Sequence, residues 1–329
     1  MSRRRVAMLL ALLVVFGTYL PARGADRLTI GYTAISGVFA GLWVADHAGI
    51  FEKYGIRSGL AYIPAASKMV QTMLGGDILF AGAGGIAAVE ANLAGGDFLM
   101  VGAVANVPAF YILALPEIKS VADLRGKTVG VTRLATATDF TMRYLLRKHG
   151  LEPGRDVHIL QTGDLFAAAA ALRIRSIVAA PFSSPADLQA RKAGARELVN
   201  MAKAGIYFPH DAWMARRGFI AANEDLVRRF LKGYSEGVHR LHADREVSRR
   251  AIARIVRSTD PEVLDAVYKY AVDYIDKVPY VVQEGIQEVL TQVAVKNPKA
   301  RTAKPEEFYD NRYVKELETA GFYKQLWGK

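Results

Sequence analysis

Short apolar runs alternate along this chain with longer segments of helical spacing, and glycine-rich joints separate them. Apolar runs bounded by turn residues are typical of buried strands, and helical spacing of apolar positions is typical of helices packed on one face. The pattern predicts strands at residues 28–32, 59–63, 98–104, 127–131, 157–162, 177–180 and 198–201. It predicts helices at residues 39–47, 68–74, 139–149, 166–172 and 186–193.

One joint, in residues 78–90 (ILFAGAGGIAAVE), connects an apolar strand to an Ala-rich helix. Its G-x-G-x-x-A spacing matches a dinucleotide-binding turn, but a nicotinamide enzyme would also need an acidic residue at the end of the next strand to hold the ribose. That strand, 98–104, is followed by Ala105 and Asn106 instead. We therefore expect a turn whose backbone amides cradle a polar group at a helix N-terminus.

The same unit of strand, small-residue loop, helix and glycine occurs twice, at residues 28–49 and again at residues 127–150. Helical segments dominate after residue 223, where Asn223 and Thr259-Asp260-Pro261 provide good helix starts. The chain is therefore expected to be an α/β protein with two similar lobes, mostly parallel sheets and a helical C-terminal region.

The first 24 residues have the three parts of an export signal: the basic residues Arg3 to Arg5, the apolar run 6–16, and small residues near Gly24. The apolar run is shorter than the roughly 18 residues that span a bilayer. We expect residues 1–24 to be a signal peptide and the mature protein to be periplasmic.

Composition excludes several classes of site. The chain has no cysteine, so disulfides, thiolate metal sites, a cysteine nucleophile and a lipid-modified cysteine are ruled out. The formal charge of +11 includes four arginines of the first 24 residues, and the other cations are interleaved with acids on amphipathic segments. Such spacing is typical of solvated helix faces, and we expect no nucleic-acid partner.

Residues 124–131 (LRGKTVGV) with 138–157, and residues 46–56 (DHAGIFEKYGI), resemble signatures of the periplasmic solute-binding proteins of nitrate, sulfonate and taurine ABC importers, a group that includes thiamine-pyrimidine-like members. The resemblance covers nearly the whole chain after residue 24, in the same order. It implies a type II periplasmic binding fold, with lobe I at 26–108 and 216–329 and lobe II at 109–215.

The function that the resemblance implies is that of an ABC transporter substrate-binding protein, not an enzyme. It would capture a small polar or anionic organic molecule, of the sulfonate, carboxylate or aromatic acid type, between two closing lobes. It would need no cofactor, would act as a monomer, and would deliver the ligand to an inner-membrane permease with its ATPase. An enzyme or a ligand sensor on the same fold is the alternative.

Ligand contacts are expected at the carboxyl ends of the strands, where open α/β sheets bind their ligands. Arg133 could pair with an acidic ligand, or it could instead point to solvent or bridge the lobes on closure. Thr138 could instead cap a helix, and Asp139 could instead compensate its dipole. The candidate residues are Ser36, Gly37, Phe39, Ala83, Gly84, Gly85, Asn106, Arg133, Thr136, Thr138, Asp139, Asp164, Pro181 and Phe182.

A metal site is not expected. His239 and His242 have the spacing of two ligands on one helix face, but no third ligand can be assigned to them. We interpret them as a surface pair.

Overall fold

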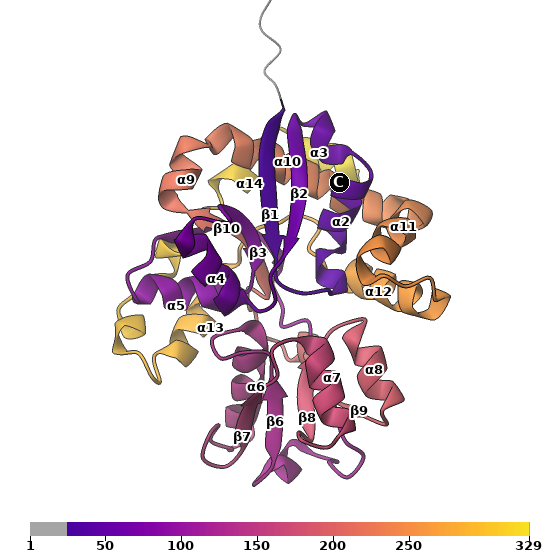
Figure 1. Ribbon diagram of the computed structural model, residues 1–329. Coiled ribbons are helices and arrows are strands. Elements are labelled where there is room, and N and C mark those ends of the chain that lie inside the picture. The colour runs from indigo at the N-terminus through magenta and orange to yellow at the C-terminus, as the bar shows by residue number, and fades with distance from the viewer. Residues whose placement is uncertain (1–24, 329) are drawn as a thin grey trace, which may run out of the picture.

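The computed structural model describes residues 25–328, which form two lobes, each built on a five-stranded sheet (Figure 1). The first sheet has the strand order β2 (Ile56–Tyr62), β1 (Asp26–Tyr32), β3 (Phe80–Ala83), β10 (Asp211–Arg216) and β4 (Phe98–Ala105). The second has the order β7 (His158–Gln161), β6 (Thr128–Val131), β8 (Ala179–Phe182), β5 (Tyr111–Ala114) and β9 (Arg196–Asn200).

Each sheet contains one reversed strand. Strand β1 pairs in parallel with β2 and β3, and β6 pairs in parallel with β7 and β8, whereas β10 and β5 are antiparallel to both of their neighbours. The expected α/β architecture with mostly parallel sheets is confirmed. Neither reversed strand is among those predicted from the sequence.

Helices cover both sheets, and those of the C-terminal region pack on the first lobe (Figure 1). The first lobe contains η1 (Gly37–Phe39), α2 (Ala40–His47), α3 (Ile50–Lys53), α4 (Ala66–Gly75) and α5 (Gly85–Leu93). The second contains η2 (Val121–Leu124), α6 (Ala137–Lys148), α7 (Leu165–Arg173), α8 (Ala186–Lys192) and η3 (Met201–Lys203). The C-terminal region contains α9 (Arg217–Ala222), α10 (Glu224–Ala243), α11 (Arg245–Val256), α12 (Pro261–Tyr274), α13 (Gln283–Val293), η4 (Pro298–Arg301), η5 (Pro305–Glu307), α14 (Arg312–Thr319) and α15 (Phe322–Trp327).

Local signals explain the ends of several helices. Asp260 accepts a hydrogen bond from the backbone N–H of Glu262, and Pro261 occupies the first turn of α12, as the sequence indicated. Helix α6 begins at Ala137 rather than at residue 139, because Thr136 is already the extended N-cap residue. This difference of two residues places Thr138 and Asp139 inside the first turn of the helix.

The core of the first lobe is held together by close packing of α10 against α2. A Cβ added to Gly237 of α10 would lie 2.6 Å from both the Cβ of Ala45 and the carbonyl oxygen of Gly41. The two helices can approach this closely only because Gly237 lacks a side chain. On the sheet side, Trp213 of β10 is fully buried and stacks on Phe80, with ring centroids 6.3 Å apart.

Two segments connect the lobes and hydrogen-bond to one another. The first crosses between β4 and β5, and the second between η3 and β10. The N–H of His210 donates to the carbonyl of Ala105 at 3.0 Å, and the N–H of Phe208 donates to that of Asn106 at 2.8 Å. These bonds pair the two crossing segments with each other.

Within residues 25–328, none of the helices combines the length and the apolar character that crossing a bilayer requires. The expected signal peptide, residues 1–24, lies outside the described part of the chain.

Candidate ligand-binding site

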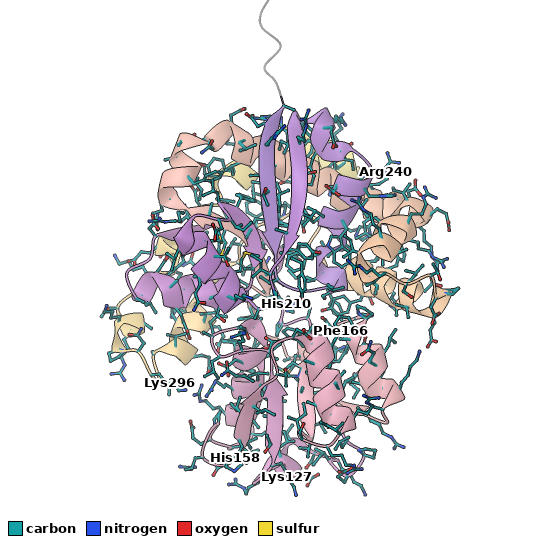
Figure 2. The ribbon with its side chains drawn as sticks, viewed as in Figure 1. Lys127, His158, Phe166, His210, Arg240 and Lys296 are labelled. Carbon is teal, nitrogen blue, oxygen red and sulfur yellow. The ribbon has the colours of Figure 1, made fainter. Side chains whose placement is uncertain are left out.

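A cavity of about 50 Å³ lies between the two lobes, at the carboxyl ends of the parallel strands of both sheets. The first lobe contributes the loops after β1 and β3 together with Tyr62, and the second contributes the loops after β6, β7 and β8. Phe110 and His210 come from the crossing segments. In Figure 2, His210 and Phe166 lie where the two lobes meet. The cavity is thus placed where the topology of the sheets predicts a ligand.

Five of the residues expected from the sequence line this cavity, and they come from four different loops. They are Ser36, Gly84, Thr136, Thr138 and Asp164. Gly84 lies at the contact between the lobes, because a Cβ there would be 3.4 Å from the carbonyl oxygen of His210 and 3.5 Å from the Cβ of Ala137. Their role as ligand contacts remains a prediction.

Other expected residues lie beneath the lining of the cavity. The side chains of Phe39, Ala83 and Phe182 are fully buried in the hydrophobic cores, and Pro181 belongs to β8, where it is paired with β5. The backbone N–H groups of two expected glycines already donate hydrogen bonds within the protein. Gly85 donates to the carbonyl of Pro209 and Gly37 donates to that of Ser184, each at 3.0 Å. The second of these bonds joins the two lobes.

Asn106 is bonded to the C-terminal region and does not line the cavity. Its side-chain N–H groups donate to the carboxylate of Asp276 and to the carbonyl of Tyr280, both at 2.7 Å, and its side-chain oxygen accepts from the N–H of Val282 at 3.1 Å. Burial raises the pKa of Asp276 to about 6, against the lowering effect of the bonds from Asn106. These contacts indicate a structural role.

Arg133 and Asp139 also lie away from this cavity. Arg133 is exposed. Asp139 accepts from Nε of Arg143 at 2.7 Å and from the N–H of Ala135 at 3.2 Å, which fits the first-turn role considered for it. It lines a second cavity, between α5, α6 and α13.

The central polar pair of the main cavity is His210 and Asp211, which the sequence did not indicate. Nδ1 of His210 accepts from the N–H of Ala109 at 3.1 Å, so the neutral ring carries its proton on Nε2. Nε2 lies 3.6 Å from Oδ2 of Asp211, and Thr33 donates to Oδ1 of Asp211 at 3.4 Å. Burial lowers the pKa of His210 to about 3 and raises the pKa of Asp211 to about 8.

Three threonine hydroxyls form a cluster on the second lobe. Thr138 accepts from the N–H of Thr132 at 2.9 Å, and Thr136 donates to the carbonyl of Arg133 at 2.7 Å. The three Oγ1 atoms lie within 3.2 Å of one another. Thr138 is therefore not the N-cap residue, although its hydroxyl does order the loop before α6.

Asp164 and Tyr62 come to the cavity from opposite lobes. Oδ1 of Asp164 caps α7 by accepting from the N–H of Ala167 at 2.8 Å. Burial is the main cause that raises the pKa of Tyr62 to about 12, and the charge of Asp164 adds to it. Ser183 is 1% exposed, and its hydroxyl has no hydrogen-bond partner among residues 25–328. A buried, unpaired hydroxyl that lines a cavity is available to a ligand.

Several of these residues gave weak signals in the sequence. Asp211 is an acid at the start of the apolar segment Asp211–Arg216, and an acid in such a run points to a special role. Thr33 precedes Ser36 in a loop that was already a candidate. Nothing local indicated Tyr62 or Ser183.

Residues 25–328 contain no group of three or more side chains with metal-binding chemistry in ligand geometry. The rings of His239 and His242 both pack edge-on against Trp327, with centroids 5.1 and 5.3 Å apart.

The family model described as NMT1/THI5 like matches residues 36–247. The putative binding protein YtlA of Bacillus subtilis (strain 168) is 22% identical over 234 residues, which are 69% of this chain and 70% of that protein.

Two solved structures share the fold. The alkanesulfonate-binding protein SsuA from Xanthomonas axonopodis pv. citri, bound to MOPS, has a TM-score of 0.72 at 21% identity and covers 86% of this chain and 96% of its own. The periplasmic nitrate-binding protein NrtA from Synechocystis PCC 6803 has a TM-score of 0.69 at 12% identity and covers 90% of this chain and 89% of its own.

These likenesses confirm the resemblance seen in the sequence and the two-lobed periplasmic binding fold. Because the family model covers more than half of its length, this chain belongs to the NMT1/THI5-like family.

Proposed function

We propose that this protein is the periplasmic substrate-binding component of an ABC importer, which captures a small polar organic molecule between two closing lobes. The observation that carries the proposal is the cavity at the lobe junction, which is lined from both sides. A ligand that touches both lobes favours the closed state, because it makes all of its contacts only there. The binding proteins among its relatives support the same class of function.

The lobes of this proposal are residues 26–108 with 216–329, and residues 109–215. Closure would bend the paired crossing segments, whose backbone bonds join residues 105 and 106 to residues 208 and 210. Strand β10 pairs with β3 and β4 of the first sheet, and by this criterion the first lobe resumes at Asp211 rather than at residue 216.

The location is part of the same proposal. Residues 1–24 would direct export as a signal peptide, and a chain without cysteine would not carry a thioether-linked lipid. In the periplasm the protein would diffuse as a monomer between its ligand and an inner-membrane permease with its ATPase. The periplasmic proteins that share its fold support this location.

The ligand class expected from the sequence was a polar or anionic molecule, with Arg133 as its counter-ion. Arg133 is exposed and does not line the cavity, so the argument from that residue no longer supports an acidic ligand. The polar groups that do line it are hydroxyls, carboxyls and one imidazole.

Native mass spectrometry tests the proposed function. The protein would be purified from a periplasm, and its mass would be compared before and after denaturation and refolding. We expect a small mass to be lost on denaturation and to bind again, unchanged, when it is added back. Chemical conversion of that molecule by the protein would favour the enzyme alternative. No bound mass, together with no binding from a metabolite extract, would contradict the proposal.

A further inference from the structure

The cavity is acidic in a chain that is basic overall. Two carboxyl groups line it, those of Asp164 and Asp211, and none of its lining residues in the described part of the chain is a lysine or an arginine. Its imidazole, His210, is held neutral, since burial lowers its pKa to about 3. An oxyanion would therefore find no positive side chain in this cavity.

Several backbone N–H groups around the cavity are already hydrogen-bonded within the protein. Helix N-termini at the ends of strands bind anions through free N–H groups. Here the N–H of Val38 is bonded to Oγ of Ser36, that of Gly85 to the carbonyl of Pro209, and that of Ala167 to Oδ1 of Asp164. At least one donor at each of these three helix starts is thus already used by the protein itself, whereas the start of α6, at Thr136, has no side-chain cap.

The hydroxyl groups can present acceptors to the cavity. Thr136 donates to the carbonyl of Arg133, and Thr138 and Thr132 can each donate within the cluster. All three protons can then be used internally, which leaves lone pairs of Thr132 without a donor. The unpaired hydroxyl of Ser183 and the second carboxyl oxygen of Asp164 add further acceptors.

Asp211 is the group most in need of a partner. It is 5% exposed, and its contacts are a hydroxyl at 3.4 Å and a neutral imidazole at 3.6 Å. The phenols of Tyr234 and Tyr270, on α10 and α12, are the other titratable groups that act on it. None of these groups is a cation, and a buried carboxylate without a positive partner is costly.

From this combination we propose that the ligand is a small organic cation, a protonated amine or amidinium, with Asp211 as its counter-ion and Asp164 as a second acceptor. N–H groups on the ligand would pair with the outward lone pairs of Thr132 and with the hydroxyl of Ser183. This inference rests on the proposed function, because it assigns the ligand class of the same cavity.

Binding should release a proton. Burial raises the pKa of Asp211 to about 8, so the empty site holds a neutral carboxyl group at neutral pH. A bound cation favours the ionised form and displaces the proton. As pH rises toward that pKa, the affinity should therefore increase by about tenfold per pH unit, and it should level off above the pKa.

Matched probes test the proposed charge. Acetamidinium, acetamide, acetate and methanesulfonate are similar in size and differ in charge, and their affinities for the refolded protein can be measured by titration calorimetry. We expect acetamidinium to bind at least tenfold more tightly than acetate or methanesulfonate, with proton release. Asp211→Asn should remove at least tenfold of that affinity, and Asp164→Asn, which keeps the helix cap, should remove a smaller part. Asp77→Asn, on an exposed turn, is the control and should change nothing.

The small molecule recovered from the periplasmic protein gives an independent result. A basic molecule supports the inference. An acidic molecule, or tighter binding of acetate or methanesulfonate than of acetamidinium, would overturn the inference and leave the proposed function intact. If no molecule is recovered and none of the four probes or a metabolite extract binds, both are contradicted.

Discussion

Nε2 of His210 lies 3.6 Å from Oδ2 of Asp211, and both side chains are almost completely buried. The pair connects the crossing segments to the cavity. Nδ1 of His210 accepts from the N–H of Ala109 on the other crossing segment, and Asp211 accepts from Thr33 in the loop after β1. A change in the charge of either group is therefore expected to affect the stability of the fold as well as the cavity.

The first prediction concerns pH and stability. Asp211 keeps its proton in the folded state up to about pH 8, whereas the unfolded chain loses it near about pH 3.9, so its contribution to stability falls as pH rises between these values. His210 stays neutral in the folded state down to about pH 3, whereas the unfolded chain is protonated below about pH 6.5, so its contribution rises with pH over that window.

The two effects oppose each other between about pH 4 and 6.5, and only that of Asp211 remains between about pH 6.5 and 8. The free energy of unfolding should therefore fall in this upper window by up to about 1.4 kcal/mol per pH unit. Urea unfolding of the ligand-free protein, compared with Asp211→Asn, measures this fall. Parallel pH profiles of the two proteins would show that Asp211 does not titrate as described.

A second prediction concerns Gly84, which lies where the lobes meet. Its backbone angles are open to other residues, and a Cβ there makes only ordinary contacts, 3.4 Å and 3.5 Å from its nearest neighbours. Gly84→Ala should keep ligand affinity within about threefold, whereas Gly84→Leu should fill the small cavity and abolish binding. Calorimetry with the recovered ligand measures both, and circular dichroism checks that the fold is kept. Full binding by Gly84→Leu would remove this loop from the site.

Arg133 provides a third prediction. Because its side chain is exposed and lies outside the cavity lining, Arg133→Ala should change ligand affinity by less than about twofold. The same titration measures it. A tenfold loss of affinity would contradict this prediction. It would indicate that Arg133 contacts the ligand and would support an acidic ligand.

A fourth prediction concerns the packing of α10 on α2. Gly237→Ala would place a methyl group 2.6 Å from the Cβ of Ala45, and overpacking of this kind costs about 1 to 3 kcal/mol. Gly218→Ala in α9, where no atom lies within 4 Å of the added Cβ, is the matched control and should be neutral or stabilising. Thermal and urea unfolding compare the two. Equal stabilities would contradict the close approach of the helices.

Local patterns in the sequence were enough to predict most of the fold. The strand, glycine turn and helix at residues 78–90 appear as β3 and α5, because apolar runs and glycine joints are local signals. Strands β5 and β10 were not predicted as strands. Their pairing partners lie far away in the sequence. Because neither strand is joined to a partner by a hairpin turn, no local signal in the sequence predicts them.

The site was less predictable, because it depends on contacts between distant residues. Loops at the ends of strands could be identified from topology, and this selected Ser36, Gly84 and Asp164. The direction in which a loop side chain points could not be predicted from topology. This is why Arg133 was considered as a ligand contact. The bond from Thr33 to Asp211 joins residues 178 positions apart, and no pattern in the sequence connects them.

The last prediction separates a structural role from a ligand contact at Asn106. Its side chain donates to Asp276 and Tyr280 and accepts from Val282, so that all of these bonds hold the C-terminal region against the first crossing segment. Asn106→Ala would leave the carbonyl of Tyr280 and the N–H of Val282 without partners, and would leave the carboxylate of Asp276 only the backbone N–H of residue 106. It should lower the free energy of unfolding by about 2 to 4 kcal/mol. Ligand affinity of the folded fraction should stay within about threefold. Unfolding in urea and calorimetry below the transition measure the two effects separately. A large loss of affinity at unchanged stability would instead place Asn106 in the binding site, because a ligand contact has little effect on the empty protein.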